Sequence, residues 1–525
     1  MIVKVKLLTS LCIGTLITGS ALACTTILVG NNATTDGSII VARNDDTSNA
    51  LKTFAIMNHP QTINSSGKLY RSNANNFTYT LPAISLAYTA LPRSFSKSKP
   101  NFSMEEVGIN ESGVAISATE TIFNSANALK IDPYLEESGI NEDSIPSVIL
   151  QSAHSAREGI MLLGSIIEKQ GAAEGFGVAI SDKTDGTWYL ETASGHRWVA
   201  WRLPNDSFFV SANQGRTQKV NLRDANNFMG SGDLIKFAVD NDLYSPKSRG
   251  FWDWLTGSNE VNPEESFNFF KVYVENGEHD KTYNYPRIES LEQLYTGSSY
   301  TIGDGLFPVW ETPTKKLSVA DVAAGLRLHY QGTEYDPYTT QNPKAPYRPA
   351  SVMRAIFSHI TQIRPNLPDD IAYVEYIAIG MPDLSIYIPF YRGLPEIPLS
   401  YQTAVDAAPD NTSEYWKYRK LQALVMQNYP KYAPMVHEQF AQFESEMFVK
   451  QAAVEETYLK LYEMDPKQAD NLLQQFTEIL ISQADVLVNN LTKKIANDLK
   501  MNNLSNADYA KLIDKTEKEY HYGGA

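Results

Sequence analysis

Cys24 has the clearest potential for chemistry in this sequence, because of what precedes it. Lys4 and Lys6 come before an apolar stretch, residues 7–23, which carries no charge and ends in Ala-Leu-Ala. This pattern is typical of a secretory signal peptide with an A-x-A cleavage site. Cleavage there would make Cys24 the first residue of an exported chain and would remove Cys12, the other cysteine. We therefore expect a mature protein without an internal disulfide, secreted or associated with the cell envelope.

A cysteine at the N-terminus carries a thiol and a free α-amine on one residue. The amine has an ordinary pKa of about 7.7–8.0, so near neutral pH part of it is unprotonated and can accept the thiol proton. One residue then supplies both nucleophile and base. Two other interpretations of Cys24 are open. A lipid on its sulfur would anchor the protein, or the residue is an inert buried cysteine.

The residues after Cys24 predict a β-hairpin. Residues 25–30 and 38–43 are strand-forming, and a turn-forming stretch lies between them. If residue 30 pairs with residue 38, the antiparallel register places Cys24 opposite Asn44. A tighter turn would slide the pairing by several residues.

Three charged residues at the end of the second predicted strand are then expected close to the thiol. They are Arg43, Asp45 and Asp46. An arginine beside a thiol favours the thiolate, and an acid beside an α-amine orients the amine.

These residues resemble the start of a known family, the secreted dipeptidases related to dipeptidase A of lactic acid bacteria. The shared motifs are Cys-Thr-Thr at 24–26, Asp-Gly-Ser at 36–38 and Arg-Asn-Asp-Asp at 43–46, followed in order by residues 108–121, 191–198, 211–216, 329–337 and 388–391. Several ordered matches are far more specific than one short motif. The family consists of cysteine N-terminal-nucleophile hydrolases, and penicillin V acylase and bile salt hydrolase are more distant relatives.

The resemblance implies roles for four residues of a catalytic site. Cys24 would be the nucleophile through its sulfur and the base through its α-amine. Arg43 would position and support the thiolate, and Asp46 would hold the α-ammonium form. Asn213 would donate its amide to the oxyanion, a contact whose loss typically costs a factor of about 10²–10³ in rate.

Further residues are candidates for substrate binding. The relatives' site includes a distal arginine, and Arg348 and Arg354 are both candidates for it. Asn110 is a second pocket candidate, although its Asn-Glu-Ser-Gly sequence is equally typical of a hairpin turn. Spacing alone also leaves open a cysteine–histidine pair with His154 or His359, which an N-terminal cysteine does not require.

Strand patterns at residues 176–181, 187–193, 196–202 and 207–212 predict an antiparallel meander. Another strand pair is expected at 371–380 and 384–389, and helices at 147–170 and 319–330. Strand groups mixed with helices, without regular βαβ alternation, favour the α+β class. The family resemblance implies an αββα sandwich, in which helices cover two antiparallel sheets.

The composition changes beyond about residue 410, where Glu, Lys, Gln, Ala and Leu dominate. Apolar residues spaced by three or four predict an amphipathic helix there, namely Leu473, Phe476, Leu480, Ala484, Leu487 and Leu491. We expect a signal peptide at 1–23, an N-terminal-nucleophile hydrolase domain at 24–410 and a helical C-terminal region at 411–525 packed on the core. A homo-oligomer formed through these helices is left open.

The composition of the 525-residue chain excludes several classes of partner. Its formal charge is −15 at pH 7, and no basic cluster follows the first few residues. Nucleic acid is therefore not expected as a partner, nor is stable membrane insertion after signal cleavage. The sequence contains no motif of zinc peptidases, serine hydrolases, nucleotide-binding loops or calcium loops. We expect no metal and no cofactor.

Three functions remain as hypotheses. The first is an exported cysteine dipeptidase that acts on dipeptides or short peptides through Cys24. The second is an amidase of the penicillin V acylase or bile salt hydrolase type, which would use the same site. The third is a lipid-anchored envelope binding protein without catalysis.

Overall fold

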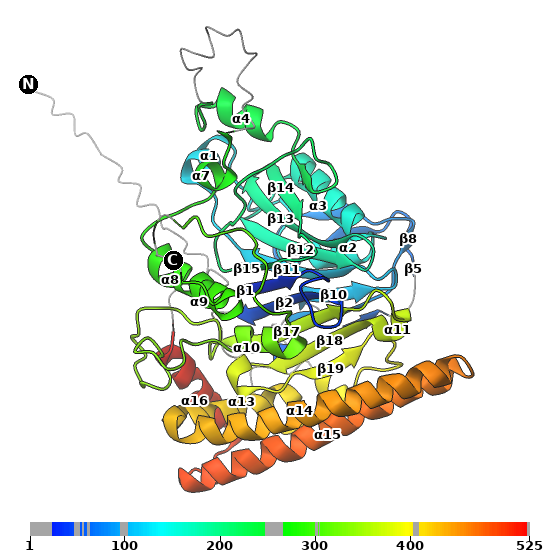
Figure 1. Cartoon of the computed structure of the whole chain (residues 1–525), viewed down its shortest axis with the longest axis vertical. Helices are drawn as coiled ribbons and strands as arrows, with labels where there is room; N and C mark the ends of the chain where they lie inside the picture. Colours follow the sequence, from blue (N-terminus) through cyan, green and yellow to red (C-terminus); the bar gives the residue numbers. More distant parts are fainter. Residues whose placement is uncertain are drawn as a thin grey trace, which may run out of the picture.

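The computed structural model describes residues 24–46, 53–54, 57–59, 63–94, 103–246, 266–299, 303, 305–402 and 409–521. The predicted signal peptide, residues 1–23, lies outside them. Two large antiparallel sheets of described residues form the centre, and helices cover the outer face of each (Figure 1). The fold is therefore the expected α+β arrangement of four layers, αββα.

The first sheet carries the residues that directly follow Cys24. Its strands in spatial order are β15 (Phe208–Ser211), β1 (Thr25–Val29), β2 (Ile39–Asp46), β17 (Ala355–Ile363), β18 (Tyr373–Ile379) and β19 (Ile388–Tyr391). The burial of these strands is complete along their length, because one face packs on helices and the other on the second sheet.

The second sheet faces it and supplies a wall of the site. Its strands in spatial order are β16 (Phe228–Gly230), β14 (Arg197–Arg202), β13 (Gly186–Ser194), β12 (Phe176–Asp182), β11 (Ala115–Thr121), β10 (Ser103–Asn110), β9 (Tyr88–Ser94) and β3 (Thr53–Phe54), with β4 (Met57–His59) also on β9. Two short pairs stand apart: β5 (Ile63–Asn64) with β8 (Ile84–Ser85), and β6 (Leu69–Arg71) with β7 (Thr78–Thr80).

Helices α2 (Ile145–Leu150) and α3 (Ala156–Gln170) cover the second sheet. The sequence predicted one helix over 147–170, but Ser155 interrupts it, because its side chain caps α3 by accepting from the backbone N–H of Glu158. On the first sheet, α9 (Tyr285–Thr296) packs against β15 and α10 (Val319–Leu326) against β1, β2 and β17. Shorter elements are α1 (Ala126–Ile131), α4 (Leu234–Asp240), α7 (Phe269–Tyr273), α8 (Asp280–Tyr283), α11 (Asp369–Ala372), α12 (Leu399–Gln402), η1 (Pro382–Leu384) and η2 (Met426–Asn428).

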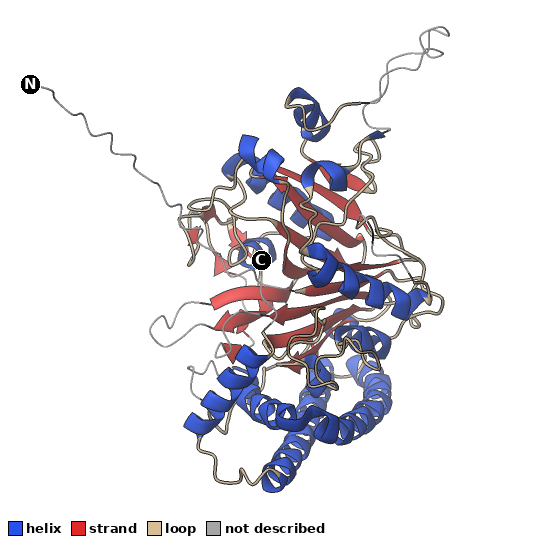
Figure 2. Ribbon diagram, turned by 90° about the vertical axis from the view of Figure 1, so that its left-hand side faces the viewer, coloured by secondary structure: helices blue, strands red, loops and turns tan. Residues whose placement is uncertain are grey.

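Long helices follow the sheets and lie below β19 in Figure 1. They are α13 (Glu414–Val425), α14 (Tyr429–Tyr462), α15 (Pro466–Asp498) and α16 (Asn506–Glu519). α13 packs on β18 and α15 on β19, while α14 and α15 lie side by side (Figure 1). Figure 2 shows long helices gathered on one side of the sheets. One hydrophobic cluster runs from the first sheet into these helices, and the predicted stripe from Leu473 to Leu491 lies in it. None of the described helices combines the length and apolar character that crossing a bilayer requires.

The hairpin of β1 and β2 is shifted by one residue from the predicted register. Thr25, not Cys24, lies opposite Asn44. The backbone N–H of Gly30 donates to the carbonyl of Ser207, so β1 ends earlier and the connection to β2 is longer than predicted. The predicted register is therefore wrong, and a shift of one residue exchanges the two faces of a strand.

This shift decides which acid faces the thiol. Leu28 and Val41 lie on the face between the two sheets, packed with residues of β12, β13 and β14. Side chains alternate along a strand, so Cys24 and Asp45 lie on this inner face as well. Asp46 lies on the opposite face, toward the helices.

The fourth strand of the predicted meander belongs to the other sheet. β12, β13 and β14 are neighbours as predicted, but β15 pairs with β1, and Ser211 lies opposite Thr26. The meander prediction is wrong for this strand, because an alternating pattern identifies a strand but not the sheet edge that it joins. Continuing the same pairing by two residues brings Asn213 opposite Cys24.

Candidate active site

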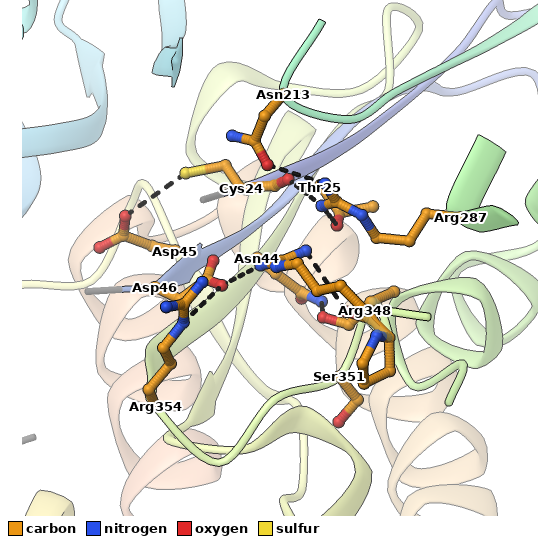
Figure 3. Close-up of polar contacts among 12 residues, drawn as sticks. Cys24, Thr25, Asn44, Asp45, Asp46, Asn213, Arg287, Arg348, Ser351 and Arg354 are labelled. Carbon is orange, nitrogen blue, oxygen red and sulfur yellow. Dashed lines mark hydrogen bonds and ion pairs between the residues drawn. The ribbon is translucent and has the colours of Figure 1, made fainter. Parts of the chain in front are cut away.

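The thiol of Cys24 is buried between the two sheets, next to the first residue of β1. Nη1 of Arg43 lies 3.1 Å from its Sγ. Oδ1 of Asp45 lies 3.9 Å from the same sulfur (Figure 3). The sulfur thus lies between a cation and an anion that are themselves 3.5 Å apart.

Arg43 is held against the sulfur by the second sheet. Its Nε donates to Oγ of Ser117 at 3.1 Å, and its Nη1 donates to the carbonyl of Thr119 at 2.9 Å. Its Nη2 donates to Oε2 of Glu106 at 3.1 Å. Burial raises the pKa of the Cys24 thiol, and Arg43 opposes that rise. The arginine acts in the direction expected from sequence, but burial outweighs it in the full-length chain.

Asn213 follows β15 and has its amide oriented by two contacts. Its Oδ1 accepts from Nη2 of Arg287 at 2.8 Å, and its Nδ2 donates to the carbonyl of Thr121 at 3.2 Å. Because the amide oxygen faces Arg287, the amide nitrogen lies on the side of the Cys24 sulfur (Figure 3). This orientation suits a donor to an oxygen that develops negative charge beside the thiol.

Arg287 enters the site from the first turn of α9. Its N–H groups donate to neutral oxygens only, namely the carbonyls of Tyr283 and Cys24, Oγ1 of Thr25, Oδ1 of Asn213 and Oδ1 of Asn284. No carboxylate of the described residues pairs with it. Burial and the nearby charge of Arg348 lower the pKa of Arg287 to about 10. The site therefore holds a buried positive charge that is not neutralised by an acid.

Asp46 lies away from the thiol and binds both candidates for the distal arginine. Its Oδ2 accepts from Nη2 of Arg348, and Nε of Arg354 lies 3.7 Å from the same oxygen (Figure 3). Although burial disfavours the charged form, Asp46 raises the pKa of Arg348. The other oxygen, Oδ1 of Asp46, is buried and has no hydrogen-bond partner in the described part of the chain.

Tyr283 brings these arginines together. The guanidinium carbons of Arg287 and Arg348 lie 5.0 and 5.1 Å from the centre of its ring, within the range of cation–π interactions. Nη2 of Arg354 donates to its hydroxyl at 3.1 Å. Positive charge is thus concentrated on the helix side of Cys24.

Glu120 on β11 adds a buried carboxylate near Cys24. The hydroxyl of Thr26 donates to its Oε2. Burial raises the pKa of Glu120 to about 7, so this acid is protonated in part at neutral pH.

Asn110 does not join this cluster. Its Oδ1 accepts from the backbone N–H of Val114 at 2.9 Å, and its Nδ2 donates to the carbonyls of Leu150 at 3.1 Å and Ala153 at 2.7 Å. These contacts close the hairpin turn after β10 and attach it to the end of α2. They are the contacts of a turn residue, the alternative that its sequence also indicated.

Neither candidate histidine contacts the thiol. His154 is exposed and lies 3.1 Å from Oγ of Ser112. His359 is buried on β17, opposite Arg43, and its Nε2 lies 3.0 Å from Oγ of Ser117. Burial lowers the pKa of His359. In the first sheet, β2 lies between β17, which carries His359, and β1, which follows Cys24.

Three residues of the site were not identified from sequence. Glu120 lies inside the matched segment 108–121, which was a usable signal. Tyr283 and Arg287 lie in α8 and α9, where the sequence carries only a Tyr-Asn-Tyr-Pro-Arg stretch without a recognisable motif. Among the described residues, no group of three or more His, Cys, Asp or Glu is arranged to hold a metal ion.

Comparisons with known proteins extend these observations. The family model described as Peptidase family C69 matches residues 23–442. A probable dipeptidase of Salmonella dublin is 47% identical over 395 residues, which cover 74% of this chain and 85% of that protein. A probable dipeptidase of Latilactobacillus sakei is 33% identical over 411 residues, covering 78% of this chain and 82% of that protein. The alignment with a mutant conjugated bile acid hydrolase from Clostridium perfringens has 10% identity and a TM-score of 0.27, and it covers 68% of this chain and 89% of that chain.

Proposed function

The chain belongs to peptidase family C69, and from this premise we propose that it is an exported dipeptidase whose mature N-terminal residue, Cys24, is the nucleophile. Membership makes the chain a peptidase, and its family's cysteine chemistry agrees with the buried thiol. The dipeptidase names of the relatives support the substrate class. A binding protein without catalysis does not fit a member of a peptidase family.

Export through a cleavable signal peptide is part of this proposal. The charged start, the apolar stretch and the Ala-Leu-Ala sequence before Cys24 support it. The family match also begins at residue 23, beside the proposed cleavage point.

The observation that carries the mechanism is the arrangement of two groups around one sulfur. Nη1 of Arg43 lies 3.1 Å from Sγ of Cys24, and the amide of Asn213 is turned to the same sulfur by Arg287. Arg43 stabilises the thiolate before attack. Asn213 donates to the oxyanion that forms after attack. The first contact serves the ground state and the second serves the transition state.

The reaction is a two-step acyl transfer. The α-amine of mature Cys24 accepts the thiol proton, and the sulfur attacks the scissile carbonyl carbon to form a C–S bond. The tetrahedral intermediate collapses, the C–N bond breaks, and the α-ammonium returns the proton to the leaving amine. A water molecule then gives a proton to the α-amine and attacks the thioester, and the thiolate leaves.

Asp46 supports the α-ammonium form in this mechanism. Its Oδ1 is buried without a hydrogen-bond partner among the described residues, while Oδ2 is held by Arg348 and Arg354. An ammonium group at the end of β1 would supply the missing donor. In a dipeptide, the residue after the scissile bond carries the C-terminal carboxylate. In this mechanism the same two arginines supply the positive charge that binds this carboxylate.

A panel of dipeptides with purified protein that starts at Cys24 tests the proposal. We expect hydrolysis of dipeptides by this protein and none by the Cys24→Ala variant of the same length. Acylated amino acids and conjugated bile salts belong in the same panel, because an amidase would use the same site. Faster turnover of those amides than of every dipeptide would assign the amidase function instead.

A further inference from the structure

Glu120 differs from the other carboxylates whose charges act on the Cys24 thiol, which are Asp45 and Asp46. Asp45 is paired with Arg43 at 3.5 Å, and Asp46 is paired with Arg348 and Arg354. Glu120 has no cation within ion-pair distance among the described residues. A carboxylate buried without a cation is costly, so its retention calls for an explanation.

The hydrogen bonding of Glu120 is also incomplete. Its Oε2 accepts from the hydroxyl of Thr26, whereas its Oε1 is buried and has no hydrogen-bond partner in the described residues. The side chain is 1% exposed. An orphaned oxygen of this kind is a vacant acceptor for a donor that the chain itself does not supply.

The position of Glu120 places this vacant acceptor beside the reacting atoms. The residue before it, Thr119, accepts from Arg43 through its carbonyl, and the residue after it, Thr121, accepts from Asn213. Thr26, which binds its carboxylate, is two residues from Cys24 on the same face of β1. Glu120 therefore lies between two residues whose carbonyls accept from Arg43 and Asn213, the proposed partners of the thiolate and the oxyanion.

Substrate chemistry identifies the donor. In a dipeptide the free α-ammonium is attached to the carbon next to the scissile carbonyl, so whatever binds it must lie beside the nucleophile. We propose that Glu120 binds the α-ammonium group of the substrate and thereby restricts cleavage to peptides with an unblocked N-terminus. This inference rests on the proposed function. The contact would be a charge-assisted hydrogen bond in a buried site, which is the strong kind.

Rejection of blocked substrates follows from the same burial. A substrate without the amine leaves the Glu120 carboxylate without its partner, and a site built around such a group rejects analogues that lack it by large factors. The raised pKa of Glu120, about 7, agrees with a carboxyl that is poorly solvated until a cation arrives.

The test compares one dipeptide from the panel with its deamino analogue, in which hydrogen replaces the α-amino group. For the wild-type protein we expect kcat/KM to be at least about 10²-fold lower for the analogue. For Glu120→Gln we expect kcat/KM for the dipeptide to fall, so that it exceeds kcat/KM for the analogue by no more than about tenfold. Two results would overturn the inference. One is an equal loss of kcat/KM on both substrates in Glu120→Gln, and the other is equal kcat/KM of the wild-type protein for the two substrates.

Glu106→Gln is the matched control, because Glu106 is another buried carboxylate of this wall but is paired with Arg43. It should lower kcat/KM for both substrates by the same factor. If Glu120→Gln does not fold, a measurement on the wild-type protein replaces it. This measurement compares inhibition of dipeptide hydrolysis by an amino acid amide with inhibition by the deamino form of the same amide. The amide is expected to bind at least about tenfold more tightly, and equal binding would contradict the inference. Wild-type protein that cleaves no dipeptide would instead refute the proposed function.

Discussion

Nη2 of Arg287 donates to Oδ1 of Asn213 at 2.8 Å, and this contact, together with the donation of Nδ2 to the carbonyl of Thr121, sets which way the Asn213 amide faces. The same guanidinium donates to the backbone carbonyl of Cys24 at 2.8 Å. One side chain from α9 thus contacts both Cys24, which directly precedes β1, and Asn213, which follows β15. In the proposed mechanism Arg287 is a positioning residue, because it acts on the reaction through Asn213.

Replacing Arg287 by Lys should therefore imitate the loss of Asn213. A lysine keeps the charge but cannot make the five hydrogen bonds, so we expect kcat to fall by about 10²–10³-fold with a smaller change in KM. The double variant with Asn213→Ala should lose no more than the worse single variant, because the two residues act as a unit. Steady-state kinetics with thermal melting as a folding control measures this, and additive losses would show that Arg287 acts independently of Asn213.

The one-residue shift in the β1–β2 register predicts different roles for Asp45 and Asp46. The charge of Asp45, on the thiol's face, raises the pKa of Cys24 more than that of Asp46 does. Asp45→Asn should lower the pH at which iodoacetamide alkylates the thiol, by roughly one unit. Asp46→Asn should move it less while lowering kcat, because it removes the partner of Arg348. A larger alkylation shift in Asp46→Asn would contradict the observed register.

The Glu120 inference predicts a pH dependence of KM. The carboxyl has a pKa raised to about 7, and only its ionised form attracts an ammonium group. KM for a dipeptide should therefore rise as pH falls below about 7, by up to tenfold per unit, and this rise should be missing in Glu120→Gln. Charged or titratable groups that face Glu120 are Arg43, Arg287 and Arg348, together with Cys24 and Tyr189. Measuring kcat and KM separately from pH 5.5 to 8 separates their effects, and a flat KM in wild-type protein would count against the inference.

A buried histidine should make stability fall in alkali. Nδ1 of His329 lies 2.9 Å from Oδ1 of Asp336, and its Nε2 lies 2.9 Å from the hydroxyl of Tyr429 on α14. Burial lowers the pKa of His329, but Asp383 and Asp336 raise it by more than burial lowers it, so that the pKa is about 9. The folded pKa exceeds the unfolded value of about 6.5, so the stabilisation is complete below pH 6.5 and is lost as pH rises through 9. Tm should fall by a few degrees over this range in wild-type protein and by less in His329→Asn; parallel curves would contradict the assignment.

Sequence reasoning located the part of the site that local pattern specifies. Cys24 and Arg43 belong to adjoining strands, so any hairpin places them close together, and Asn213 lies at the end of a recognisable strand. The register was missed because it depends on the length of the turn, and Gly30 pairs with Ser207 of a different segment. Tertiary packing of this kind is not encoded in the alternation of one hairpin.

The contacts from distant elements could not be predicted. Arg287 is 263 positions from Cys24, and only the packing of α9 on β15 brings them together. The sequence did not distinguish Arg348 from Arg354 as the distal arginine. The structure does not separate them either, since both pair with Asp46. The division of the core from its C-terminal helices at residue 410 stays a prediction; the family match runs past it to residue 442, within α14.

The N-terminal-nucleophile mechanism is tested by measuring dipeptide hydrolysis by two proteins that differ only at the N-terminus. One starts at Cys24, and the other keeps Ala23 before it; intact mass confirms both. Retaining Ala23 preserves the thiol but turns the α-amine into an amide, which cannot act as base. We predict hydrolysis by the first protein and a loss of at least about 10²-fold in the second. Equal activity of the two would show that the α-amine of Cys24 takes no part in catalysis and would contradict the N-terminal-nucleophile mechanism.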